Sequence, residues 1–144
     1  MDLNVKCAYM AGVMDSDGWF RIYAVRSLRH GKVNPSYRLM LGCAQALPRD
    51  GAIRLLHETF GGTLYVYNDK KPNRSPMLRW ELWDAKAEAA VRQIYPYLLV
   101  KKDEADLVLK FRDYKKARPR GKLVGSRLTP DALEAMESFR VELI

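Results

Sequence analysis

The chain has 144 residues, of which 48% are hydrophobic and 29% charged, the size and composition of one domain with a real core. Its 25 Lys and Arg residues outnumber 17 Asp and Glu residues, and the formal charge of +8 favours a polyanionic partner. The apolar runs are too short to cross a bilayer, and the N-terminus lacks the positive cluster of a secretion signal. We therefore expect an intracellular protein with no membrane partner.

Residues 5–15 have the apolar periodicity of a helix, and Gly18 stops it. The helix finishes in two acids, Asp15 and Asp17. A carboxylate is disfavoured by about 0.3 to 1 kcal/mol at the negative C-terminal end of a helix, so a nearby cation is expected. Three small side chains fall on nearly one face of this helix and would let a second backbone approach closely: Ala8, Ala11 and Gly12.

The rest of the chain combines strand pairs and helices. Period-two alternation predicts two antiparallel hairpins: strands 19–29 and 36–46 joined by a turn at 30–35, and strands 63–69 and 77–83 joined by the basic loop 70–76. Helical periodicity predicts helices at 49–60, 85–95, 102–116 and from residue 130 onward. Asp84 and Thr129 are expected to cap the helices that follow them. This order, αββαββα with two C-terminal helices, predicts an α+β fold with one antiparallel sheet.

The cysteines and histidines carry no predicted chemistry. Cys7 and Cys43 lack metal-type spacing and are expected as reduced core residues. His30 and His57 are too widely separated to indicate a zinc site, and an HNH-type nuclease would need more histidines than this chain has.

The end of the first helix carries a recognisable motif. The segment MAGVMDSDG, residues 10–18, resembles the LAGLIDADG motif of homing endonucleases, with identical residues at five positions and conservative apolar replacements at three. The helix before it, the strand after it and the order αββαββα are those of the family. The resemblance covers roughly residues 5–118 and implies a single domain over 1–144, with a saddle-shaped sheet and a helical extension at 119–144.

The resemblance implies an active site for metal-dependent phosphodiester hydrolysis. Asp17 and the Ser16 backbone carbonyl would bind Mg²⁺ or another divalent cation such as Mn²⁺, both hard cations that prefer oxygen ligands. Gln45, at the end of a strand, would orient the attacking water. Lys101 and Arg49 would balance charge developing on the phosphate.

Two further residues are placed by the same alignment. Lys102 is the alternative to Lys101 as the active-site lysine. Asp15 is expected to hydrogen-bond backbone near the helix end and not to bind metal.

A single motif in the chain implies a homodimer, because the motif helices of two αββαββα units pack together in this family. Ala8, Ala11 and Gly12 would form that interface, and a twofold dimer would read a near-palindromic site and leave 3′ overhangs. Two Asp17 carboxylates about 5 Å apart would repel by about 3 kcal/mol at an effective dielectric of 20, which bound cations relieve.

The exposed strand faces are the predicted DNA-binding surface. A ten-residue strand spans about 33 Å, or about ten base pairs, so a dimer would cover about twenty. The predicted base readers are Arg21, Tyr23, Val25, Ser27, Arg38, Met40, Tyr65, Tyr67, Arg79 and Glu81. The predicted phosphate contacts are Lys70, Lys71, Arg74, Lys115, Lys116, Arg118 and Arg120.

Two other functions fit the same scaffold: an RNA-splicing maturase, whose partner is intron RNA, and a nuclease-inactive DNA-binding protein. Loss of Asp17 or Lys101 would favour either of them, and both residues are present. The sequence therefore favours a site-specific double-strand DNA endonuclease.

Overall fold

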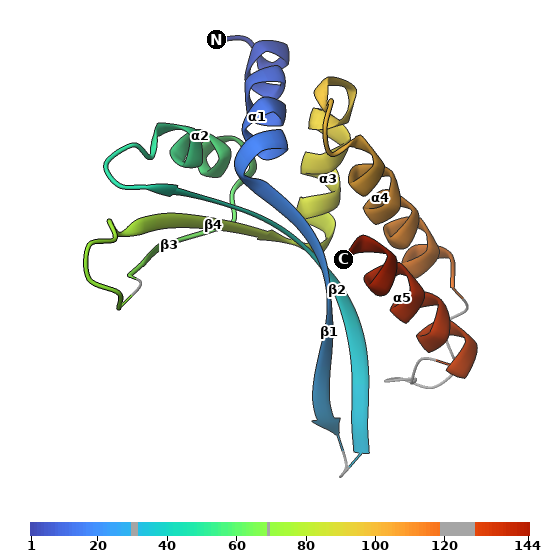
Figure 1. Ribbon diagram of the computed structural model, residues 1–144. Coiled ribbons are helices and arrows are strands. Elements are labelled where there is room, and N and C mark those ends of the chain that lie inside the picture. The colour runs from blue at the N-terminus through green and yellow to red at the C-terminus, as the bar shows by residue number, and fades with distance from the viewer. Residues whose placement is uncertain (30–31, 69, 119–128) are drawn as a thin grey trace.

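The computed structural model describes residues 1–29, 32–68, 70–118 and 129–144 (Figure 1). The predicted order of elements, αββαββα followed by two helices, is confirmed. The elements are α1 (Leu3–Asp17), β1 (Gly18–Arg29), β2 (Lys32–Ala46), α2 (Gly51–Phe60), β3 (Thr63–Tyr67), β4 (Met77–Trp83), α3 (Asp84–Ile94), the 3₁₀ turn η1 (Tyr95–Tyr97), α4 (Lys102–Ala117) and α5 (Pro130–Leu143).

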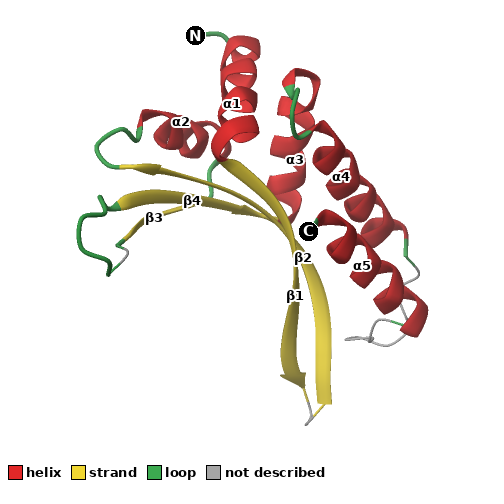
Figure 2. Ribbon diagram, in the orientation of Figure 1, coloured by secondary structure: helices red, strands yellow, loops and turns green. Residues whose placement is uncertain are grey.

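The four strands form one antiparallel sheet in the order β1-β2-β4-β3. The sheet is strongly curved, and the helices gather on its convex side (Figures 1 and 2). In the described part of the chain no helix covers the concave side, so the sheet presents an open face of side chains. None of the helices in the described ranges is long and apolar enough to cross a membrane.

The core lies between the sheet and the helices. Trp80 is fully buried there, with Leu78 and Leu82 beside it on β4, as the strand alternation predicts. The Trp80 indole N–H donates to the Gly61 carbonyl at 2.7 Å, so its one polar group is satisfied. Helix α2 ends there because Gly61 and the next glycine both adopt positive φ, which only glycine adopts without strain.

Two local predictions are wrong. Residues 32–35 of the predicted turn are strand, because β2 begins at Lys32 and pairs with β1 from there onward, and residues 30 and 31 lie outside the described residues. Pro35 fits into β2 because β4 pairs only with residues 40–46, so β2 has a neighbour on one side alone at Pro35. Asp84 does not cap a helix with its side chain; its carboxylate accepts from Arg38.

Helix α5 packs against β1 and α4. Thr129 caps it as predicted, with its side chain accepting from the Ala132 amide at 3.2 Å. Met136 is fully buried in the main core, and Phe139 makes ring contacts with two aromatic residues of α4. The Tyr37 hydroxyl donates to Glu137 at 2.8 Å and ties α5 to β2. Cys7 and Cys43 are free and buried, as expected.

Candidate active site and nucleic-acid interface

The last turn of α1 is fastened to the segment that leads into α4. The Asp15 carboxylate accepts three backbone amides, from Leu99 at 2.8 Å, Val100 at 3.2 Å and Lys101 at 2.9 Å. Burial raises the pKa of Asp15, but the three amide donors outweigh that effect and hold the pKa below its usual value. Asp15 thus makes the backbone hydrogen bonds that the resemblance implies, and its partners lie more than 80 residues along the chain.

The same segment brings an amine to the end of α1. Lys101 Nζ donates to the Met14 carbonyl at 2.8 Å and to the Gly18 carbonyl. A cation therefore lies where the helix C-terminus carries its negative partial charge, as the two acids of the motif lead us to expect. Lys102 begins α4, and its amine lies 5.0 Å from the centroid of the Tyr95 ring instead.

Asp17 is the last residue of α1 and is exposed. Gln45 Nε2 donates to Asp17 Oδ2 at 3.5 Å, although 28 residues separate the two. The antiparallel register explains this proximity, because Gly18 pairs with Cys43 and the end of β2 therefore lies beside the end of α1. Burial, and then the charge of Asp17, raise the pKa of the Cys43 thiol to about 12, so this cysteine is an inert neighbour.

Arg49 lies in the exposed turn after β2, where its backbone amide donates to the Ala46 carbonyl at 2.9 Å. Among the described residues its guanidinium has no hydrogen bond to Asp17, Gln45 or Lys101. The structure therefore brings three of the four predicted catalytic residues to the end of α1 and leaves Arg49 in the neighbouring turn.

The oxygen atoms at the end of α1 suit a divalent cation. Asp17 offers an exposed carboxylate. The Ser16 carbonyl belongs to the last turn of the helix, where no later helical amide donates a hydrogen bond to it. Over the described ranges no three His, Cys, Asp or Glu side chains meet as a metal site. One chain thus supplies hard oxygen ligands of the right type, but too few to complete a coordination shell.

The predicted small-residue face of α1 is only partly correct. Ala8 and Gly12 are exposed, but the Ala11 side chain is fully buried in the core of its own chain. Ala11 follows Cys7 by one turn and therefore shares the core-facing side of the helix. A Cβ added at Gly12 would meet nothing within 4 Å, so space remains open above that position.

The concave face carries most of the predicted base readers. Arg21, Val25, Tyr65 and Tyr67 are exposed, and the following are partly exposed: Tyr23, Arg38, Arg79 and Glu81. Met40 is a correction: it lies on this face but is only 1% exposed, because its register neighbours are the large side chains Arg21 and Trp83. The Ser27 side chain lies outside the described residues.

Two tryptophans of the concave face were not predicted as part of the interface. Trp19 lies across Gly42, where an added Cβ would overlap its ring. Trp83 lies 5.6 Å from Tyr23 between ring centroids. Strand alternation places both residues on the exposed face, which is the signal that sequence reasoning could have used.

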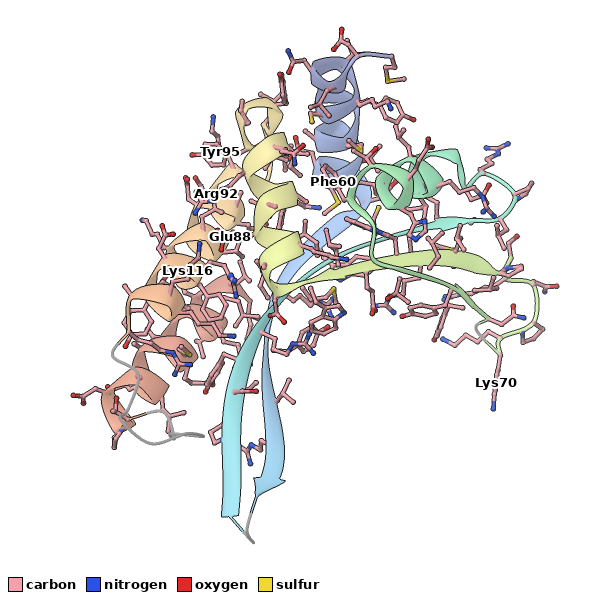
Figure 3. The ribbon with its side chains drawn as sticks, turned by 180° about the vertical axis from the view of Figure 1, so that it is seen from behind. Phe60, Lys70, Glu88, Arg92, Tyr95 and Lys116 are labelled. Atoms are coloured by element: carbon pink, nitrogen blue, oxygen red, sulfur yellow. The ribbon has the colours of Figure 1, made fainter. Side chains whose placement is uncertain are left out.

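The predicted phosphate contacts divide into two groups. Lys70, Lys71 and Arg74 are exposed in the β3–β4 loop, and Lys70 extends away from the helices in Figure 3. Lys115 and Lys116 are corrections, because both lie on α4, on the convex side, and both are engaged within the chain. Arg118 follows α4, and Arg120 lies outside the described residues.

The partners of those two lysines explain the correction. Lys115 Nζ donates to the Tyr37 carbonyl, and burial lowers its pKa although the Asp84 carboxylate opposes that effect. Lys116 Nζ donates to the buried Glu88 carboxylate at 2.6 Å (Figure 3). Each amine thus makes a contact within the chain on the convex side, away from the concave face.

The buried Glu88 carboxylate forms ion pairs with three cations between α3 and α4. Besides Lys116 it accepts from Arg112 at 2.9 Å and from Arg92 at 3.3 Å, and Figure 3 shows Glu88, Arg92 and Lys116 together. Burial raises the pKa of Glu88, but the three cations outweigh it and lower the pKa to about 2. This cluster joins two helices and lies away from the concave face.

Solved structures with this arrangement are LAGLIDADG homing endonucleases, and this chain has their fold. The homing endonuclease I-CvuI, in complex with a DNA target in the presence of Mg, matches with 19% identity over 98% of this chain and 81% of its own, at a TM-score of 0.70. The archaeal intron-encoded homing endonuclease I-Vdi141I, complexed with DNA, matches with 14% identity over 99% of this chain and 84% of its own, at a TM-score of 0.71.

A third likeness is to a longer chain. The LAGLIDADG meganuclease I-AabMI, bound to uncleaved DNA, matches with 11% identity, a TM-score of 0.70 and coverage of 94% of this chain but only 45% of its own. No protein-family model and no curated protein matches the sequence. The resemblance carried by residues 10–18 is therefore confirmed at the level of the fold.

Proposed function

We propose that the protein is a site-specific double-strand DNA endonuclease that acts as a homodimer on a near-palindromic site. The observation that carries this proposal is the meeting of Asp17, Gln45 and Lys101 at the end of α1, beside an open concave face on which arginines stack on tryptophan rings. DNA complexes of structural neighbours with the same fold support the choice of partner.

The three residues have separate roles. Asp17, with the Ser16 carbonyl, would hold a divalent cation, which would supply positive charge to stabilise the negative charge of the reacting phosphate. The Gln45 amide, within reach of Asp17, orients water towards the phosphorus atom. Lys101 carries a fixed positive charge beside the developing charge on the phosphate. Hydrolysis on both strands leaves 3′ overhangs.

A second copy of the chain completes the site. One chain brings a single exposed carboxylate, Asp17, to the end of α1, because backbone amides occupy Asp15, and a twofold axis along the paired α1 helices would bring the second. The surface around Ala8 and Gly12 favours such pairing, because the large apolar residues Val5, Tyr9, Leu99 and Val100 are 51 to 88% exposed there or beside Asp15. Small residues let helix backbones approach closely.

The dimer is tested by blocking this surface. Gly12→Leu adds a side chain where the single chain leaves space, so the monomer folds but the α1 helices cannot approach. Gly51→Leu is the matched control, because a Cβ at Gly51 also meets nothing within 4 Å, on a different helix. Sedimentation should give a dimer for the wild type and Gly51→Leu and a monomer for Gly12→Leu. A wild-type monomer at cleavage-active concentrations would refute the dimer.

The nuclease activity is tested by selecting cleaved substrates from a random near-palindromic DNA library with Mg²⁺. The wild type should cleave a defined subset, and Asp17→Asn should bind that subset without cleaving it. DNA binding by both proteins with cleavage by neither would exclude the nuclease. That outcome would favour the DNA-binding or maturase alternatives.

A further inference from the structure

Arg38 is held on the concave face by two contacts, one with an aromatic ring and one with a carboxylate. Its guanidinium lies 4.6 Å from the centroid of the Trp83 ring, and its Nε donates to Asp84 Oδ2 at 2.8 Å. The Trp83 ring is itself supported by Tyr23. The aromatic face fixes the plane of the guanidinium, and the carboxylate fixes its rotation within that plane.

Arg79 has a similar but looser arrangement elsewhere on the sheet, in which the carboxylate contact is an ion pair without a hydrogen bond to Nε. Its guanidinium lies 4.8 Å from the centroid of the Trp19 ring, and its Nε lies 3.4 Å from Glu81 Oε1. Glu81 is held in turn by the Tyr65 hydroxyl at 2.9 Å. A hollow of about 280 Å³ opens on the concave face at this point, lined by Trp19, Arg21, Ala44, Tyr67, Met77 and Arg79.

In both arrangements the edge of the guanidinium that carries the two Nη atoms is left for a ligand. Asp84 accepts a hydrogen bond from Arg38 Nε, whereas Glu81 forms only an ion pair with Arg79 Nε. Within the described residues the Nη atoms of Arg38 and Arg79 have no hydrogen-bond acceptor. Two parallel donors in a fixed plane match the O6 and N7 acceptors of guanine in the major groove. Because each side chain is already ordered, little rotamer entropy is lost when that contact forms. Arg21, by contrast, has no carboxylate partner in the described chain.

The sheet register gives the distance between the two arginines. Arg79 pairs with Ala44 on β2, and Arg38 lies on β2 six positions earlier. At about 3.4 Å per residue the separation is about 20 Å, which corresponds to about six base pairs along B-DNA. Ala44 adjoins Gln45, so Arg79 lies at the active-site end of the sheet and Arg38 lies further out.

We propose that Arg38 and Arg79 are preorganised guanine readers, so that each half-site carries two guanines about six base pairs apart, the inner one beside the cleaved phosphate. This inference rests on the proposed function and specifies the DNA sequence that the same surface recognises. Asp84 and Glu81 are positioning residues in this scheme, because they act on DNA through the arginines.

The test selects bound DNA, without Mg²⁺, from a random near-palindromic library. The wild type should enrich guanine at both positions; Arg79→Lys should lose about tenfold of the preference at the inner position alone, and Arg38→Lys at the outer position alone. Arg54→Lys, on α2 and paired with Asp50, is the control and should keep both preferences. Enrichment without the guanine pair, or both variants selecting as the wild type does, would overturn the inference while DNA binding persists.

A second variant separates positioning from folding. Asp84 has a φ of +53°, so Asp84→Gly removes the carboxylate at a position where glycine is unstrained. Guanine preference at the outer position should fall several-fold, while the inner preference stays unchanged. Equal weakening at both positions would indicate a general structural role and would overturn the role of Asp84. Failure of the wild type to bind any DNA would instead refute the proposed function, and this inference with it.

Discussion

The two sides of the sheet use their cations in different ways. On the convex side Glu88 alone engages three cations, and Lys115 is bound to a backbone carbonyl. On the concave side the arginines stack on indole rings, and the lysines of the β3–β4 loop are exposed. A net charge of +8 does not by itself locate an interface. The partner of each cation distinguishes charges that hold the fold from charges that face a ligand.

Lys101 provides the sharpest test of this distinction, because its amine lies at the proposed active-site end of the sheet although it also donates to two backbone carbonyls. Lys101→Met should reduce cleavage by about a hundred- to a thousandfold, or roughly 3 to 4 kcal/mol of barrier. DNA affinity should change much less, because the Lys101 amine is assigned to the transition state. Single-turnover cleavage and equilibrium binding measure the two effects. Parallel losses in affinity and cleavage would place Lys101 with the binding residues instead.

Glu88 tests the opposite side. Glu88→Gln keeps the size of the side chain but removes the charge that three cations share, and within the described chain only Arg92 keeps another carboxylate, Asp113. The free energy of unfolding should therefore fall by about 2 to 3 kcal/mol. Urea denaturation measures this change. Cleavage per folded molecule should stay at the wild-type value. Lost cleavage by a fully folded variant would show that the Glu88 cluster on the convex side also serves cleavage.

The same carboxylate predicts a pH dependence. The pKa of Glu88 is about 2 in the folded protein and near 4.5 in the unfolded chain, so its stabilisation is complete above about pH 4.5. As the pH falls from 4.5 towards 2, the unfolded state takes up the proton first, and this stabilisation is lost. The difference in unfolding free energy between wild type and Glu88→Gln should therefore shrink over that window. A difference that stays constant would remove Glu88 as the cause.

Gly42→Ala gives the smallest expected effect and acts on the concave side. The new methyl group would displace the Trp19 ring, at a cost of about 1 to 2 kcal/mol. Because Trp19 supports Arg79, preference at the inner guanine should weaken while the outer one is kept. Tryptophan fluorescence would report the displaced ring. Unchanged fluorescence and unchanged guanine preference would show that the position of the Trp19 ring does not depend on a glycine at residue 42.

The order of elements could be predicted from the sequence because each element carries its own periodicity, and the motif fixed the end of α1. The chemistry of individual side chains could not. Alternation places Met40 on the concave face correctly, but it does not indicate that large neighbours cover it. The basic run at Lys115 and Lys116 looks like a phosphate-binding segment, and its partners lie 78 and 28 residues away. Such long-range pairs have no local pattern.

The three amides that bind Asp15 also determine when the site can form during synthesis of the chain. Residues 10–18 leave the ribosome early, but the amides and the amine that complete the end of α1 belong to residues 99–101. A nascent chain that stops before residue 101 carries Asp17 and Gln45 without Lys101. Any fragment that ends before residue 101 therefore lacks part of the proposed nuclease site.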